Sequence, residues 1–188
     1  MPSRSRSLED AEITQVVRCW VETVVVGLNL CPFAQRELVN DRVRFAVTEA
    51  DSEDQLSAAL QSELERLQSD PRIETTLLIH PLALQDFDHY NQFLDRADRL
   101  LLHLHLDGVY QVASFHPEYQ FAGTAADDAE NYTNRSPYPM LHLIREDSLE
   151  RAIHAFAGVE DIPASNIRRM NELGQEKLRA LVQACFSR

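Results

Sequence analysis

A single cysteine offers the sharpest chemistry in this sequence. Cys31 lies in the stretch Asn29-Leu30-Cys31-Pro32-Phe33-Ala34. Because Pro32 suits the first position of a short helix, Cys31 is expected at the N-terminus of that helix. Such a position favours the thiolate, which is the nucleophilic form of cysteine. Unpaired cysteines are about as often small buried packing groups, so a catalytic and a structural role both stay open.

Two histidines each follow a predicted strand and precede a proline. They are His80 and His116. Proline keeps the residue before it extended, so both imidazoles are expected at strand ends rather than inside a helix. Ligands of open α/β sheets bind beyond the carboxyl ends of parallel strands. We therefore expect His116 to act as a general base beside Cys31, the alternative being that both histidines only cap backbone groups.

The stretch from His116 to Pro139 lacks the hydrophobic periodicity of the rest of the chain. Long irregular connections in compact domains are usually functional or disordered. Disorder is disfavoured because the stretch is rich in aromatic residues: Tyr119, Phe121, Tyr132 and Tyr138. We expect it to fold back on the sheet and to form the binding site.

Polar residues within this stretch are suited to an anionic substrate. Asn134, Arg135 and Ser136 offer hydrogen-bond donors next to a stiff Pro-Tyr-Pro segment, and Tyr119 lies upstream of them. Donors of this kind hold carboxylate or phosphate oxygens. In the alternative interpretation, Arg135 only fixes the loop by pairing with one of the acidic residues Asp127, Asp128 or Glu130.

The same histidines permit a metal site instead. His80, His116 and His142, with Cys31 or Glu118, could supply imidazole and thiolate ligands for zinc or iron. A third hypothesis is a non-catalytic binding or scaffold module that uses the loop as its contact surface. Dinucleotide-binding, P-loop and zinc-protease motifs are missing, so the sequence indicates no particular cofactor.

Hydrophobic periodicity predicts the elements that position these residues. It indicates strands at 42–47, 75–79, 109–115 and 140–144, and helices at 7–27, 51–70, 87–104, 147–157 and 163–185, the last one interrupted by Gly174. Right-handed crossovers between the first three strands predict parallel neighbours, with the fourth strand antiparallel. We expect one domain over residues 1–188, with a flexible tail at 1–6. Its fold class is an α/β two-layer sandwich on a mixed four-stranded sheet, of ferredoxin-like or thioredoxin-like order, with extra N- and C-terminal helices.

Composition limits the partners. The net charge of −12 disfavours nucleic acid and anionic membrane surfaces, which both require clustered lysine and arginine. No apolar run is long enough for a membrane span, and no secretory signal begins the chain. Three widely spaced cysteines exclude a full disulfide framework and suit a reducing cytoplasm, where we expect the protein. A small-molecule ligand is expected, and the oligomeric state stays open.

Three longer stretches carry a family resemblance. They are residues 26–34, from Val26 to Ala34; residues 114–121, from Ser114 to Phe121; and residues 133–146, from Thr133 to Glu146. With them the chain resembles the bacterial proteins grouped as domain of unknown function 1415, over nearly its whole length. The resemblance implies no activity and no cofactor. It does cover Cys31, His116 and Arg135, which the chemistry of the residues also indicates.

Overall fold

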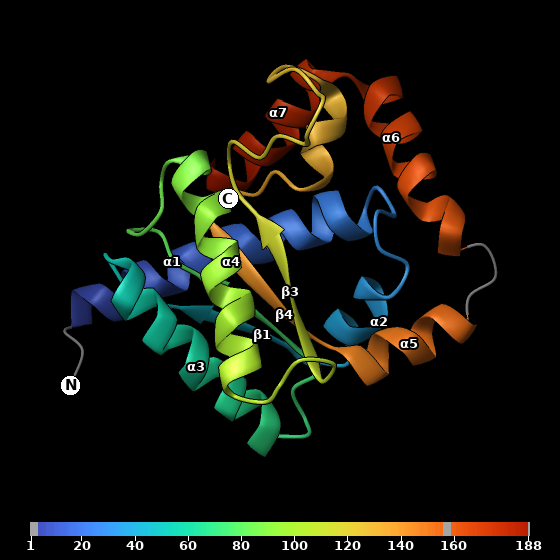
Figure 1. Ribbon diagram of the computed structural model, residues 1–188. Helices are drawn as coiled ribbons and strands as arrows, with labels where there is room; N and C mark the ends of the chain where they lie inside the picture. The colour runs from blue at the N-terminus through green and yellow to red at the C-terminus, as the bar shows by residue number, and fades with distance from the viewer. Residues whose placement is uncertain (1–3, 156–158, 188) are drawn as a thin grey trace.

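The computed structural model describes residues 4–155 and 159–187, and an open four-stranded sheet forms its centre (Figure 1). The strands are β1 (Val43–Val47), β2 (Thr75–Ile79), β3 (Tyr110–Phe115) and β4 (Met140–Arg145). The α-helices are α1 (Arg4–Trp20), α2 (Ala34–Val39), α3 (Glu53–Ser69), α4 (Phe87–His103), α5 (Glu146–Ala155), α6 (Ile162–Leu173) and α7 (Gln175–Ala184). Shorter helices are η1 (Val21–Val26), η2 (Ala129–Thr133), η3 (Val159–Asp161) and η4 (Cys185–Ser187).

The sheet has the strand order β1-β2-β4-β3. β1 pairs parallel with β2, whereas β4 lies between β2 and β3 and is antiparallel to both. The predicted mixed sheet with an antiparallel fourth strand is therefore confirmed. Because β1, β2 and β3 run in the same direction, their carboxyl ends meet at one edge. His80 and His116, which follow β2 and β3, consequently lie at the same end of the sheet.

One face of the sheet is covered by α3 and α4. Each helix presents an apolar stripe at helical spacing, as its sequence predicts. From α3 the stripe is Leu56, Leu60, Leu64 and Leu67, and from α4 it is Tyr90, Phe93, Ala97 and Leu101. These side chains form a core with Leu78, Leu141 and Leu143 of the central strands. Burial of such a leucine stabilises the fold by roughly 1.5–3 kcal/mol.

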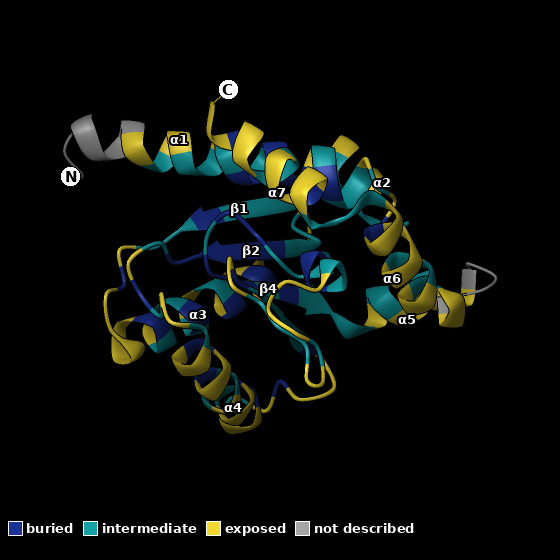
Figure 2. Cartoon of the chain, turned by 90° about the horizontal axis from the view of Figure 1, so that it is seen from above, coloured by how far each residue is buried: buried dark blue, intermediate teal, exposed yellow. Residues whose placement is uncertain are grey.

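The opposite face is covered by the terminal helices (Figure 2). Val17 and Trp20 of α1, Val24 of η1 and Leu178 of α7 pack there with Ile79 at the end of β2. Helices therefore cover both faces of the sheet, and the extra N- and C-terminal helices that the sequence predicts form the second helical layer. Periodicity identifies an apolar helix face but not the side of the sheet on which it packs, so the terminal helices could not be placed from sequence.

Helix boundaries differ from the prediction at the start of α1 and at the start of α2, whereas the break at Gly174 agrees with it. α1 begins at Arg4, so residues 4–6 of the predicted tail are helical and residues 1–3 lie outside the described part. The short helix after Pro32 begins at Ala34, two residues later than expected. The last helix is divided at Gly174, whose φ of 76° ends α6 and starts α7, as the sequence indicated. None of the helices in the described residues is long and apolar enough to cross a membrane.

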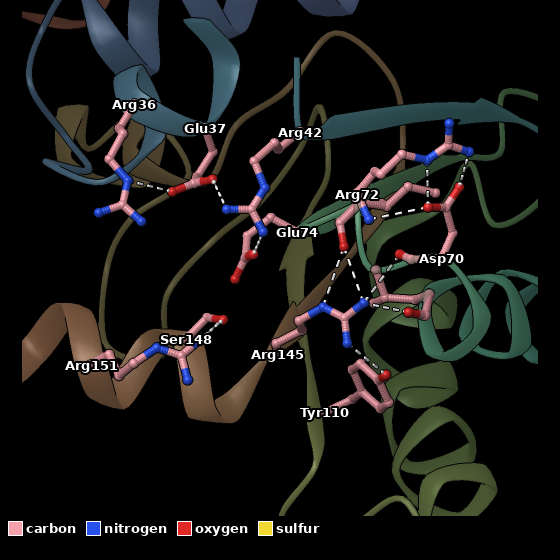
Figure 3. Close-up of polar contacts among 12 residues, drawn as sticks. Arg36, Glu37, Arg42, Asp70, Arg72, Glu74, Tyr110, Arg145, Ser148 and Arg151 are labelled. Carbon is pink, nitrogen blue, oxygen red and sulfur yellow. Dashed lines mark hydrogen bonds and ion pairs between the residues drawn. The ribbon is translucent and has the colours of Figure 1, made fainter. Parts of the chain in front are cut away.

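Arg145 forms hydrogen bonds at the end of the sheet opposite to His80 and His116 (Figure 3). Its guanidinium donates to the carbonyl oxygens of Leu67 and Ile73 and, at 3.1 Å, to the hydroxyl of Tyr110. One side chain therefore joins the last turn of α3, the segment before β2 and the start of β3. Hydrogen bonds from a charged donor contribute more than neutral ones.

Replacing this arginine is expected to destabilise the protein. Arg145→Met should lower the free energy of unfolding by about 2–4 kcal/mol, because several carbonyls lose their donor. Urea denaturation followed by circular dichroism measures the change. Arg151→Met is the matched control: this exposed arginine donates, within the described residues, to Ser148 alone, so its effect should stay within about 0.5 kcal/mol. Equal effects of the two substitutions would contradict this role of Arg145.

Candidate functional site

His116 lies at the carboxyl end of β3 with both ring nitrogens bonded to backbone. Nε2–H donates to the carbonyl of Leu84 at 3.1 Å, and Nδ1 accepts from the backbone N–H of Glu118 at 3.0 Å. This pattern fixes the neutral Nε2–H tautomer. Burial lowers the pKa of His116, which also favours the neutral ring. The ring joins the end of β3 to the segment before α4, where Leu84 has a left-handed backbone with φ of 55°.

His80 is fully buried at the end of β2. Its Nδ1–H donates to the carbonyl of Ala83 at 3.0 Å, while its Nε2 has no hydrogen-bond partner among the described residues. Burial, as the largest cause, and the nearby His116 lower the pKa of His80 to about 4. The imidazole is therefore neutral at physiological pH. The interpretation in which both strand-end histidines bond to backbone groups matches these contacts.

Tyr90 of α4 stands between the two histidines. Its ring lies 5.9 Å from that of His80 and 5.0 Å from that of His116, measured between centroids. The hydroxyl donates to the carbonyl of Met140 at 2.7 Å and accepts from the backbone N–H of Phe115 at 2.9 Å. Burial raises the pKa of this phenol far above its usual range. The sequence pattern predicts only that Tyr90 lies on the apolar face of the helix at 87–104, because a hydroxyl does not alter that periodicity.

The loop of residues 116–139 is ordered and packs back on the domain, as its aromatic content suggested. Tyr132 of η2 is buried in the second core, and η2 packs against α6. Tyr119 lies against Phe87 of α4, with ring centroids 5.2 Å apart, and contacts Phe121 at 4.9 Å. The aromatic residues thus anchor the loop at both of its halves.

Arg135 is held by the loop itself. Its Nε donates to the carbonyl of Tyr119 at 3.1 Å and its Nη2 to that of Ala126 at 2.6 Å. The guanidinium also lies over the ring of Tyr132, 4.9 Å from the centroid. No ion pair among the described residues involves Arg135. In the alternative interpretation it would pair with an acidic residue at 127, 128 or 130, but its partners are carbonyl oxygens.

Asn134 and Ser136 also bond within this region. The amide of Asn134 donates to the carbonyl of Ser114 at 2.9 Å, and the hydroxyl of Ser136 donates to the carbonyl of Tyr138 at 2.6 Å. Backbone bonds between His116 and residues 134 and 136 extend the pairing beyond the end of the sheet. Arg135 thus lies between two residues that are fixed to the end of β3.

Asn131 is a site residue that sequence reasoning missed. It is fully buried, and its Oδ1 accepts from the backbone N–H of Phe121 and from the hydroxyl of Thr124. Its Nδ2 donates to the carbonyl of Ala125 at 2.8 Å. One amide therefore closes the first half of the loop. The sequence signal for this role is an asparagine within an aromatic-rich segment. Such a segment is expected to be buried, and a buried amide needs several hydrogen-bond partners.

Cys31 lies in a turn between η1 and α2. Gly27 begins this turn, and a Cβ atom there would meet the carbonyl oxygen of Thr23 at 2.3 Å, so only glycine fits. Asn29 then takes a left-handed conformation with φ of 52°. The Cys31 thiol is half-buried and not in a disulfide. None of the hydrogen bonds in the described part of the chain joins it to a histidine.

Contacts through α6 relate the Cys31 turn to the loop. Asn166 of α6 donates to the carbonyl of Leu30 at 2.9 Å, and the same helix packs against η2. Leu30 and Tyr132 belong to the same core. The ring of His116, by contrast, packs with Tyr90 on α4. The structure thus connects Cys31 with the loop, whereas the catalytic pairing of Cys31 with His116 stays a prediction.

The three histidines of the predicted metal site do not converge. His142 lies within β4, where its Nε2–H donates to the hydroxyl of Thr75 at 2.6 Å and its ring packs near Phe115. Alternation along the strands directs it to the face opposite His80 and His116. Burial lowers the pKa of His142 to about 4. Within residues 4–155 and 159–187, no group of three or more His, Cys, Asp or Glu residues is arranged to hold a metal ion.

The chain has an α/β fold with an open mixed sheet, and the loop of residues 116–139 packs at one end of that sheet. The chain belongs to the family described as protein of unknown function (DUF1415), whose model matches residues 12–180. The matched region includes the Cys31 turn, both strand-end histidines and the whole loop. Neither the curated proteins nor the solved structures include a match to this chain.

Acid should destabilise the fold through His80. A histidine whose pKa is lowered in the folded state stabilises the protein above its ordinary pKa of 6.5, and this contribution is lost as the pH falls towards 4. The loss amounts to about 3 kcal/mol. Glutamine does not titrate. Between pH 7 and pH 4 the free energy of unfolding of His80→Gln should therefore fall by about 3 kcal/mol less than that of the wild type.

Urea denaturation at several pH values measures the difference between wild type and variant. His154→Gln is the control, because His154 is exposed on α5. If His80→Gln and the wild type lose stability in parallel as the pH falls, the buried neutral imidazole is not the cause of the acid sensitivity.

Proposed function

We propose that this chain binds a small anionic molecule on the 116–139 loop, with Arg135 as the residue that contacts the anion. The observation that carries the proposal is the fixed guanidinium of Arg135, which carbonyl oxygens and an aromatic ring hold in place of a carboxylate. In a chain of net charge −12, carboxylates are plentiful. Arg135 pairs with no carboxylate of the described residues, so its positive charge can bind an anionic ligand.

Preorganisation supports the same proposal. Arginine loses side-chain entropy when it binds a ligand, and this cost is smaller when its position is already set. With Nε and Nη2 bonded to carbonyls, Nη1 of Arg135 retains its donors. A planar guanidinium suits the geometry of a carboxylate or phosphate. Asn134 and Ser136, the neighbours of Arg135, are fixed to β3 and to the Pro-Tyr-Pro segment.

Cys31 would add chemistry to this binding site. Its thiol is half-buried, and its turn connects through Asn166 and α6 to η2. We propose Cys31 as nucleophile or thiol donor towards a ligand held by Arg135. The bonds on both nitrogens of His116 favour a positioning role for this ring over proton transfer, since a base needs a free nitrogen. Binding is therefore the better supported part of the proposal.

Removing the guanidinium should weaken anion binding. We expect inorganic phosphate or succinate to bind the wild-type protein in the millimolar range, and Arg135→Gln to weaken that binding at least about tenfold, or ~1.4 kcal/mol. Isothermal titration calorimetry measures both affinities. Arg72→Gln is the matched control, because Arg72 is exposed and bonds both oxygens of Asp70.

Two results would count against the proposal. One is that neither anion binds the wild-type protein, and the other is that Arg72→Gln weakens binding as much as Arg135→Gln does. A scaffold module predicts a different pattern, in which Arg135→Gln lowers the melting temperature and no anion binds. Thermal denaturation of each variant separates loss of the loop structure from loss of a ligand contact.

A further inference from the structure

Two cysteines from opposite ends of the chain meet inside the second core. Cys19 lies in the last turn of α1, and Cys185 begins η4 after α7. Their exposed fractions are 7% and 1%, and their sulfur atoms lie 2.6 Å apart across 166 positions of sequence. The bond in a disulfide is about 2.05 Å long. Small movements of either side chain would bring the two atoms to that distance.

The surroundings keep the two sulfur atoms directed at each other. Cys185 Sγ donates to the carbonyl of Leu181 one turn earlier in α7, at 3.6 Å, and Cys19 Sγ lies 3.7 Å from the hydroxyl of Thr23 one turn later. Both cysteines belong to the second core, in which α1 contacts η4 and η1 contacts α7. The approach is therefore set by the packing of helical segments within this core.

We propose that Cys19 and Cys185 form a reversible intramolecular disulfide that links α1 to the C-terminal segment. The third cysteine, Cys31, lies in a separate turn between η1 and α2 and is half-buried. This inference goes beyond the binding function proposed for the loop and does not depend on it. It assigns a redox-modifiable crosslink to the terminal helices.

Thiol–disulfide exchange with a small-molecule disulfide such as oxidised glutathione would form the crosslink. Cys185 would be reached by local opening of η4, whose next residue, Phe186, is 44% exposed. The Cys185 thiolate attacks one glutathione sulfur, the glutathione S–S bond breaks, and the first glutathione leaves as a thiolate. The Cys19 thiolate then attacks the Cys185 sulfur of the mixed disulfide and releases the second glutathione.

The reaction is balanced without any other reagent. The two protein thiols lose two electrons and two protons, and oxidised glutathione takes up both to become two glutathione thiols. The product encloses almost the whole chain in one covalent loop. A crosslink over so many residues removes much of the conformational freedom of the unfolded state. Oxidation should therefore raise the melting temperature by roughly 5–10 °C.

The test uses the full-length protein incubated with oxidised glutathione and then denatured without reductant. Thiol titration should show one thiol in place of the three that the sequence contains. Intact mass should show the loss of two hydrogens without added glutathione. Tryptic mapping should recover the Cys19 and Cys185 peptides joined to each other, and dithiothreitol should separate them. The mapping is done on wild-type protein, so it does not depend on whether a cysteine variant folds.

Cysteine variants then test whether the rise in melting temperature depends on the crosslink. Cys31→Ser should keep the oxidation-dependent rise in melting temperature, whereas Cys185→Ala should abolish it. Retention of all thiols, a glutathione adduct on one cysteine as the end product, or a crosslink that includes Cys31 would each overturn the proposal. If mapping shows the crosslink but the melting temperature is unchanged, the stabilising role of the crosslink is overturned.

Discussion

The hydroxyl of Tyr90 is the contact on which the loop end of the sheet depends. It accepts from the backbone of β3 at Phe115 and donates to the backbone of β4 at Met140, the two positions where the loop leaves and rejoins the sheet. The ring also packs against both His80 and His116. One side chain of α4 thus fixes both ends of the loop and the packing of both histidines, and the geometry around Arg135 follows from that.

Much of this arrangement could be predicted from the sequence. Alternating hydrophobic patterns located each end of the four strands to within one residue. The prolines after His80 and His116 indicated that both rings follow a strand. The aromatic residues correctly indicated an ordered loop. These predictions succeeded because each depends on local periodicity or on a backbone restriction that neighbouring residues impose.

Partners that are distant in sequence could not be predicted. His116 bonds to Leu84, whose left-handed backbone carries no sequence signal, and Arg135 bonds to carbonyl oxygens that every residue possesses. The pairing of Cys19 with Cys185 depends on how α1 and α7 share one face of the sheet. In each case the three-dimensional packing decides which groups meet, and the residue types alone leave many equivalent choices.

The register at the end of β3 and β4 has a consequence for how this fold can diversify. Phe115 pairs directly with Met140, so the loop begins and ends on adjacent strands at a single point of the sheet. The entropy cost of closing such a loop grows only with the logarithm of its length. Residues can therefore be inserted or removed between those points during evolution while the strands keep their alignment. The length of the loop can therefore change while the sheet that carries it stays the same.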